Sequence, residues 1–106
     1  MAKSRRQAFR VVLFKEGNVW SAQCLEFDIA TQAKTPRGLA FAVQRAIAGQ
    51  VLVALQNRMT PFKGLPPAPK RFWKMFESGV RLAPDEFRIK VQGVESSAEA
   101  RVAEVV

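Results

Sequence analysis

A chain of 106 residues, 48% of them hydrophobic, has room for one domain with a modest core. It carries 17 lysine and arginine residues against 9 acidic residues, which gives a net charge of +8. It has no histidine, which excludes a Ser–His triad, a histidine general base and a His-ligated zinc site. Its single cysteine, Cys24, permits no internal disulfide, and no stretch of the sequence holds the roughly 18 uncharged apolar residues of a membrane span. We therefore expect a cytoplasmic protein, and we expect it to bind no metal or cofactor.

The first three predicted elements are strands. Residues Phe9 to Phe14 favour β-structure, and they are followed by a turn over Lys15 to Asn18, in which Gly17 tolerates a positive φ. Residues 19–24 then alternate in the pattern of a second strand, so the two runs form a hairpin. A third strand is expected over residues 29–34.

Thr35 and Pro36 mark the start of a long helix. The threonine hydroxyl can accept a hydrogen bond from the first turn, and the proline lacks an N–H where none is needed. The helix should run to about Gln56 or Arg58. Its apolar arc is broader than one small sheet would cover, so either another subunit or the segment that follows must cover the rest. The stripe that faces the sheet is predicted to be Ala40, Val43, Ile47, Val51 and Ala54.

The second half of the chain is predicted to be more irregular. Four prolines between Thr60 and Pro69 end the long helix, and Lys70 to Ser78 reads as a short helix. Phe87 to Val91 alternates and predicts a fourth strand, whereas residues 95–106 predict a loosely helical or disordered tail. The expected fold class is therefore α+β, in the order β-β-β-α-α-β. It is a single domain over residues 1–94, with a mostly antiparallel sheet and the helices on one face.

Residues 9–56 resemble the HicB-like antitoxin family, whose N-terminal domain is a partial, degenerate ribonuclease H-like fold. The resemblance lies in the opening strand and in the string Trp20-Ser21-Ala22-Gln23-Cys24-Leu25-Glu26-Phe27-Asp28-Ile29-Ala30-Thr31-Gln32. In the family the third strand leads into Gly-x-Thr and a helix, and Thr35 matches that threonine. The family's glycine is replaced by Ala33. The glutamate expected three residues after the threonine is replaced by Gly38, which removes half of the capping box.

The resemblance implies a non-catalytic antitoxin that binds and occludes a small, basic, RNA-cleaving toxin. A chain of net charge +8 repels a basic toxin at long range, so the interface needs a local acidic patch, for which Glu26 and Asp28 are the candidates. The same two residues equally suit a cap and a turn beside the third strand. A ribonuclease H-like active site needs several carboxylates around Mg²⁺, one of them on the first strand, and residues 9–15 contain none, so no catalysis is expected.

A second interpretation rests on the basic residues. No acidic residue lies between Asp28 and Glu77, and a candidate nucleic-acid surface within this stretch consists of Lys70, Arg71, Trp73 and Lys74. The alternative is that the apolar side chains of this short helix pack on the sheet while its basic residues are only solvated. Three functions therefore remain open: an antitoxin, a basic nucleic-acid-binding module, and an orphan domain without a toxin. A homodimer or larger homo-oligomer is expected, held by the long helix or by sheet edges.

Overall fold

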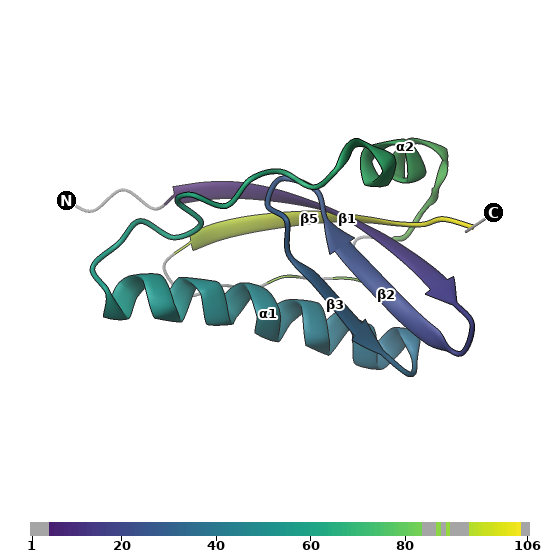
Figure 1. Ribbon diagram of the computed structural model, residues 1–106, viewed down its shortest axis with the longest axis horizontal. Coiled ribbons are helices and arrows are strands. Elements are labelled where there is room, and N and C mark those ends of the chain that lie inside the picture. Colours follow the sequence, from purple (N-terminus) through teal and green to yellow (C-terminus); the bar gives the residue numbers. More distant parts are fainter. Residues whose placement is uncertain (1–4, 84–86, 88, 90–93, 105–106) are drawn as a thin grey trace.

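The computed structural model describes residues 5–83, 87, 89 and 94–104, and within them the chain forms five strands and two helices (Figure 1). The α+β class is confirmed, and the first three strands and both helices lie where the sequence predicts them. In chain order the elements are β1 (Arg5–Glu16), β2 (Val19–Cys24), β3 (Ala30–Ala33), α1 (Pro36–Gln56), α2 (Lys70–Ser78), β4 (Val80–Arg81) and β5 (Val94–Val102).

The strands form one mixed sheet in the order β3-β2-β1-β5-β4. The β1–β2, β2–β3 and β4–β5 pairs are antiparallel, but β5 runs parallel to β1 over nine residue pairs. The expectation of a mostly antiparallel sheet is therefore wrong. A parallel neighbour requires a long crossover, and the chain between β1 and β5 provides one through the hairpin, both helices and β4.

The prediction of a loose tail over residues 95–106 is also wrong, because Val94–Val102 forms β5 beside the central strand. The residues in β5 alternate as a strand requires: Ala98 and Ala100 pack with the core, while Glu99 and Arg101 project from the other side. Alanine, serine and glutamate favour strands weakly on their own. Nine residue pairs with a well-buried neighbour outweigh that local preference.

The strand predicted over residues 87–91 lies largely outside the described residues. Of its members the structure describes only Phe87 and Ile89, and neither is in a strand. Both are nevertheless buried, at 4% and 5% exposure, in the cluster that contains α1.

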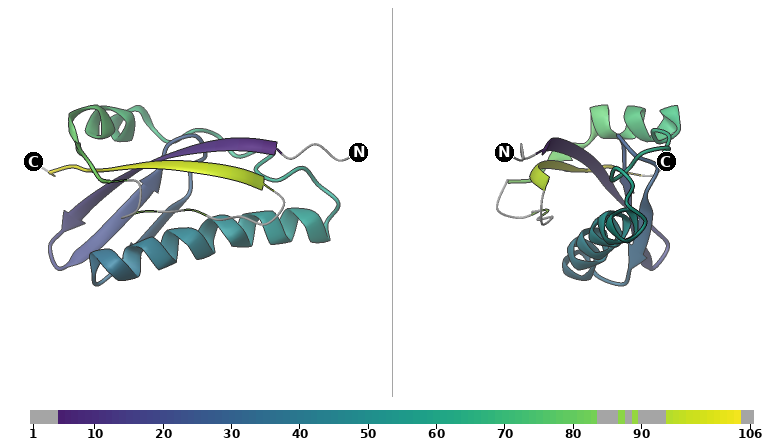
Figure 2. Two further views of the ribbon diagram at one scale, coloured as in Figure 1. Left: turned by 180° about the vertical axis from the view of Figure 1, so that it is seen from behind. Right: turned by 90° about the vertical axis from the view of Figure 1, so that its left-hand side faces the viewer.

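The two helices lie on opposite faces of the sheet, not on one face as expected (Figure 2). One face of β1, with Phe9 and Val11, packs against α1, and the other, with Val12 and Phe14, packs against α2. The chain changes faces in the proline-rich connector, which is hydrogen-bonded to the β2–β3 link: the amide of Asp28 donates to the carbonyl of Pro66 at 2.7 Å and that of Ala68 to Leu25 at 2.9 Å. Both faces of β1 are covered between Val11 and Phe14, and over these four residues its sequence is continuously apolar.

The long helix begins as its sequence predicts. The Thr35 hydroxyl accepts a hydrogen bond from the amide of Gly38 at 3.0 Å, and Pro36 occupies the first turn. By length and composition α1 is also apolar enough to cross a membrane. In this compact, globular fold the stripe Leu39, Val43, Ile47 and Val51 is buried against the sheet, which accounts for part of that apolar character.

Candidate macromolecule-binding groove

The α2 face of the sheet is only partly covered. Phe72 and Phe76 are buried in a cluster with Val12 and Phe14 of β1, and the rings of Phe14 and Phe72 stack with their centroids 6.0 Å apart. The cluster that holds α2 on the sheet takes its strand residues from β1, and it includes no residue of β2 or β3. The same face of those two strands therefore forms the floor of a groove.

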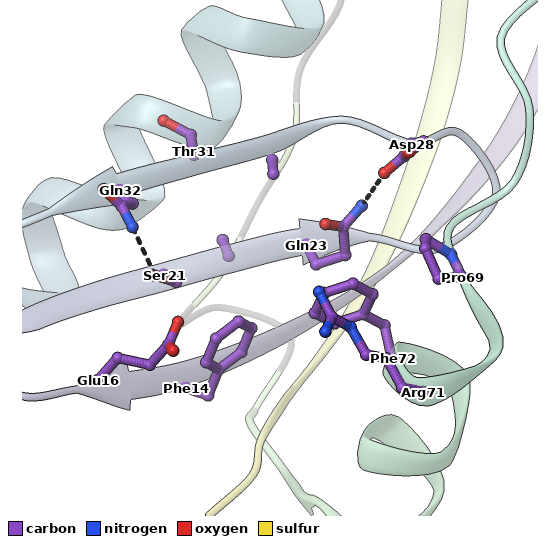
Figure 3. Close-up of a pocket in the computed structure, with 12 residues that line it drawn as sticks. Phe14, Glu16, Ser21, Gln23, Asp28, Thr31, Gln32, Pro69, Arg71 and Phe72 are labelled. Carbon is purple, nitrogen blue, oxygen red and sulfur yellow. Dashed lines mark hydrogen bonds between the residues drawn. The ribbon is translucent and has the colours of Figure 1, made fainter. Parts of the chain in front are cut away.

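The groove has a volume of about 570 Å³ and lies between the three-stranded half of the sheet and α2 (Figure 3). Its lining comes from four parts of the chain, three of them within residues 14–32 and the fourth within residues 69–72. These are β1 and β2, the β2–β3 link with β3, and the start of α2, which contribute Phe14, Glu16, Ser21, Ala22, Gln23, Asp28, Ala30, Thr31, Gln32, Pro69, Arg71 and Phe72.

Hydrogen-bonding side chains form the floor of the groove. Ser21 and Gln23 are buried on β2, at 5% and 4% exposure. The register places Ser21 opposite Gln32, whose side-chain amide donates to the serine hydroxyl at 3.3 Å. The amide of Gln23 donates to Asp28 at 2.8 Å and to the carbonyl of Cys24 at 3.0 Å. These mutual bonds make it possible to bury polar side chains on a sheet face, and they hold amide and hydroxyl groups in fixed positions.

The two predicted acidic residues hold the β2–β3 link, and only one of them lines the groove. Glu26 accepts a hydrogen bond from the backbone amide of Arg10 at 2.7 Å and pairs with its guanidinium at 2.5 Å. Asp28 is exposed, accepts from Gln23 and lines the groove. A third carboxylate, Glu16, was not predicted from the sequence, and it lies on the groove side at the end of β1. Its position two residues after Phe14, on the same side of a strand, was the available signal.

The four residues of the predicted nucleic-acid surface do not lie together. Arg71 reaches the groove with its guanidinium 4.6 Å from the Phe72 ring centroid. Trp73 is two residues further along the helix, about 200° round its axis, and so lies on the opposite flank. There its indole N–H donates to the carbonyl of Ala68 at 3.1 Å, and the guanidinium of Arg10 lies over its ring in a cation–π contact. Lys70 and Lys74, four residues apart, are exposed together on the outer side of α2.

The described residues offer little for metal or thiol chemistry. Among them there is no group of three or more cysteine, aspartate or glutamate side chains that could hold a metal ion. Burial raises the pKa of the Cys24 thiol to about 11, so this side chain is protonated at neutral pH and packs as a small apolar group.

The arrangement suits recognition of a polypeptide. The exposed side-chain amide of Gln32 can bond to a partner's backbone, and Phe14 and Phe72 provide an apolar wall. Both signs of charge are present in Glu16, Asp28 and Arg71. Comparisons of the chain with protein-family models, with curated proteins and with solved structures find no match.

Proposed function

We propose that this chain is a cytoplasmic, non-catalytic protein-binding module of the HicB-like antitoxin kind, and that its groove receives a segment of a basic, RNA-cleaving toxin. The observation that carries the proposal is the presence of two exposed carboxylates, Glu16 and Asp28, in the groove of a protein whose net charge is +8.

The electrostatic argument depends on distance. At long range two basic proteins repel, but in physiological salt the interaction between exposed charges decays over about 8 Å. Within that distance a basic side chain that enters the groove is close to Glu16 and Asp28. Glu26 contributes less to this local field, because Arg10 already pairs with it.

The order of the elements adds support. The HicB-like resemblance over residues 9–56 leads one to expect three strands and then a helix that starts at Thr35, and the chain has β1, β2, β3 and α1 with Thr35 as the cap. A ribonuclease H-like site needs several carboxylates around Mg²⁺, whereas β1 carries one, Glu16, at its exposed end, and none between Phe9 and Lys15.

A nucleic-acid-binding module is the weaker candidate. Glu16 and Asp28 in the groove would repel a phosphate backbone. Arg71 and Trp73 lie on opposite flanks of α2, so they do not form one continuous surface for a strand of nucleic acid. Lys70 and Lys74 remain exposed and can still attract phosphate at low salt.

The test asks whether a short reading frame beside this gene encodes a small basic protein, and co-expresses that product with the chain. We expect the two proteins to co-purify and the chain to suppress RNA cleavage by its neighbour. Glu16→Lys should raise the dissociation constant about tenfold or more, because it places a like charge against a basic partner. Glu77→Lys is the matched control, since it makes the same charge change at an exposed site on the outer side of α2, and it should change the constant less than about twofold.

Three outcomes would contradict the proposal. A neighbouring product that neither cleaves RNA nor binds the chain would exclude the antitoxin role. Equal losses from Glu16→Lys and Glu77→Lys would exclude the groove as the site. Finally, salt-sensitive binding of single-stranded RNA that is lost on Lys70→Glu and Lys74→Glu, without any toxin complex, would instead support the nucleic-acid module.

A further inference from the structure

The outer side of α1 carries large apolar side chains in water. Phe41 is 67% exposed, Leu52 57% and Leu55 60%, and Met59, just past the helix end, is 53% exposed. These residues belong to a series whose spacing alternates between four and three residues, as along the seam of a coiled coil. We call this series the α1 seam: Phe41, Arg45, Ala48, Leu52, Leu55 and Met59.

The α1 seam lies on the opposite side of the helix from the stripe that packs on the sheet. The proline-rich connector does not cover it, because that segment leaves the end of α1 and crosses to the other face of the sheet (Figure 1). A contiguous exposed apolar strip on a small protein indicates an interaction surface. From Phe41 to Leu55 the helical part of the strip is about 21 Å long.

We propose that the α1 seam packs against the same seam of a second copy of this chain, with the two helices antiparallel. Around a two-fold axis near Gln50, Ala48 lies opposite the partner's Leu52, and Arg45 lies opposite the partner's Leu55. Each of these layers combines a small or flexible side chain with a bulky one, so the helices can approach closely. A parallel pair would instead place Arg45 against the partner's Arg45 and leave the small Ala48 side chains facing each other.

The charge of Arg45 also favours a second copy in this direction. The last turn of α1 contains no basic residue, although the aligned peptide dipoles leave a partial negative charge at that end of the helix. In the antiparallel pair the aliphatic part of Arg45 lies over the partner's Leu55, and its guanidinium reaches the last turn of the partner's helix. The helix therefore supplies to another copy the cation that its own last turn lacks.

The proposal is independent of the groove, which lies on the other face of the sheet. The proposed dimer also has a characteristic dependence on salt concentration. Each copy carries a net charge of +8, so salt should screen the repulsion and strengthen the dimer, whereas it would weaken binding to nucleic acid.

The first test compares two neighbouring substitutions by sedimentation equilibrium at micromolar concentrations. Leu52→Glu places a carboxylate in the centre of the seam and should raise the dimer dissociation constant by about 100-fold or more, because the charge is buried without a partner. Val53→Glu is the matched control: Val53 is 56% exposed against 57% for Leu52, but it lies about 100° away round the helix. It should change the constant less than about threefold. Circular dichroism checks that both variants are folded.

The second test determines the direction of the helices, in a Cys24→Ala background. Chains with Ala48→Cys mixed with chains with Leu52→Cys should form a disulfide between the two variants, while each variant alone should cross-link poorly. A parallel pair would give the reverse result.

Four results would overturn the proposal. The first is a monomer at every protein and salt concentration, and the second is an equal rise of the dimer dissociation constant in Leu52→Glu and Val53→Glu. The third is efficient cross-linking of Ala48→Cys chains with one another. The fourth is a monomer that binds vesicles of anionic phospholipid and loses this binding in Leu52→Glu. The last result would identify the α1 seam as a lipid-binding surface. None of these results bears on the groove, which Glu16→Lys tests separately.

Discussion

At the residue scale, two non-glycine residues with a positive φ bound the turn that follows α1. Arg58, with φ 54°, stands where helices usually place glycine, and the bonds of a Schellman motif surround it: the amide of Met59 donates to Ala54 at 2.7 Å and that of Arg58 to Leu55 at 3.2 Å. Phe62, with φ 67°, is buried, and its ring stacks on Phe27 with centroids 4.6 Å apart. Aromatic packing offsets the strain at Phe62, whereas Arg58 is exposed and has no such compensation.

Arg58→Gly should therefore raise the free energy of unfolding by about 0.5–1 kcal/mol, because glycine adopts a positive φ without the clash of a Cβ atom. Urea denaturation measures the change. Arg58→Ala is the control: it removes the same charge but keeps the Cβ atom, so its stability should stay close to that of the wild type. An equal gain in both variants would assign the effect to charge and contradict the backbone explanation.

The buried thiol of Cys24 should make stability depend on alkaline pH. Its pKa of about 11 in the folded chain lies above the ordinary value of 9.0, so between these values the folded state keeps a proton that the unfolded state has lost. The free energy of unfolding should then fall as the pH rises through this range, by about 1 kcal/mol per pH unit at most, with no contribution from this group at lower pH. Urea denaturation of the wild type and of Cys24→Ala should show the steeper fall only in the wild type. Parallel curves would contradict the assignment.

At the element scale, β5 is the strand that differs most from its prediction as a loose tail. It lies between β1 and β4 in the sheet. Its Ala100 packs on the α1 face, and its Arg101 contacts α2 on the other face. The guanidinium of Arg101 lies 4.3 Å from the ring centroid of Phe76 and also donates to the carbonyl of that residue at 3.1 Å. The end of α2 is thus fixed to the last strand.

This role of β5 predicts a contrast between two of its residues. Ala100→Glu should lower the free energy of unfolding by about 3 kcal/mol or more, since Ala100 is 3% exposed and a carboxylate there would be buried without a partner. Ser97→Glu introduces the same charge at an exposed position of the same strand and should change stability by about 0.5 kcal/mol or less. Thermal unfolding compares the two. A loose tail would tolerate both substitutions equally.

At the scale of the whole molecule, the sheet separates two surfaces of different chemistry. The groove, on the α2 face, combines polar, charged and aromatic side chains, while the α1 seam on the other face is mainly apolar. A dimer formed through the α1 seam leaves both grooves open, so that each copy can bind its own partner.

The candidate site could be predicted only in part. Asp28 was predicted as a partner-binding residue and Arg71 as part of a nucleic-acid surface, and the structure places both in the lining of the groove. Glu16, Ser21 and Gln23 were not, because nothing local to each residue shows that it faces α2. Their position depends on the β1–β2–β3 register together with the path of the connector.

The sequence by itself determined the hairpin at Gly17, the cap at Thr35 and both helices, because turns, caps and helical periodicity depend on residues within a few positions of one another. The tertiary structure alone decided that β5 pairs with β1 and that α1 and α2 lie on opposite faces. These features depend on contacts between distant segments: Arg5 pairs with Val94, and only the assembled sheet offers weakly β-favouring residues a partner strand that outweighs their local preference.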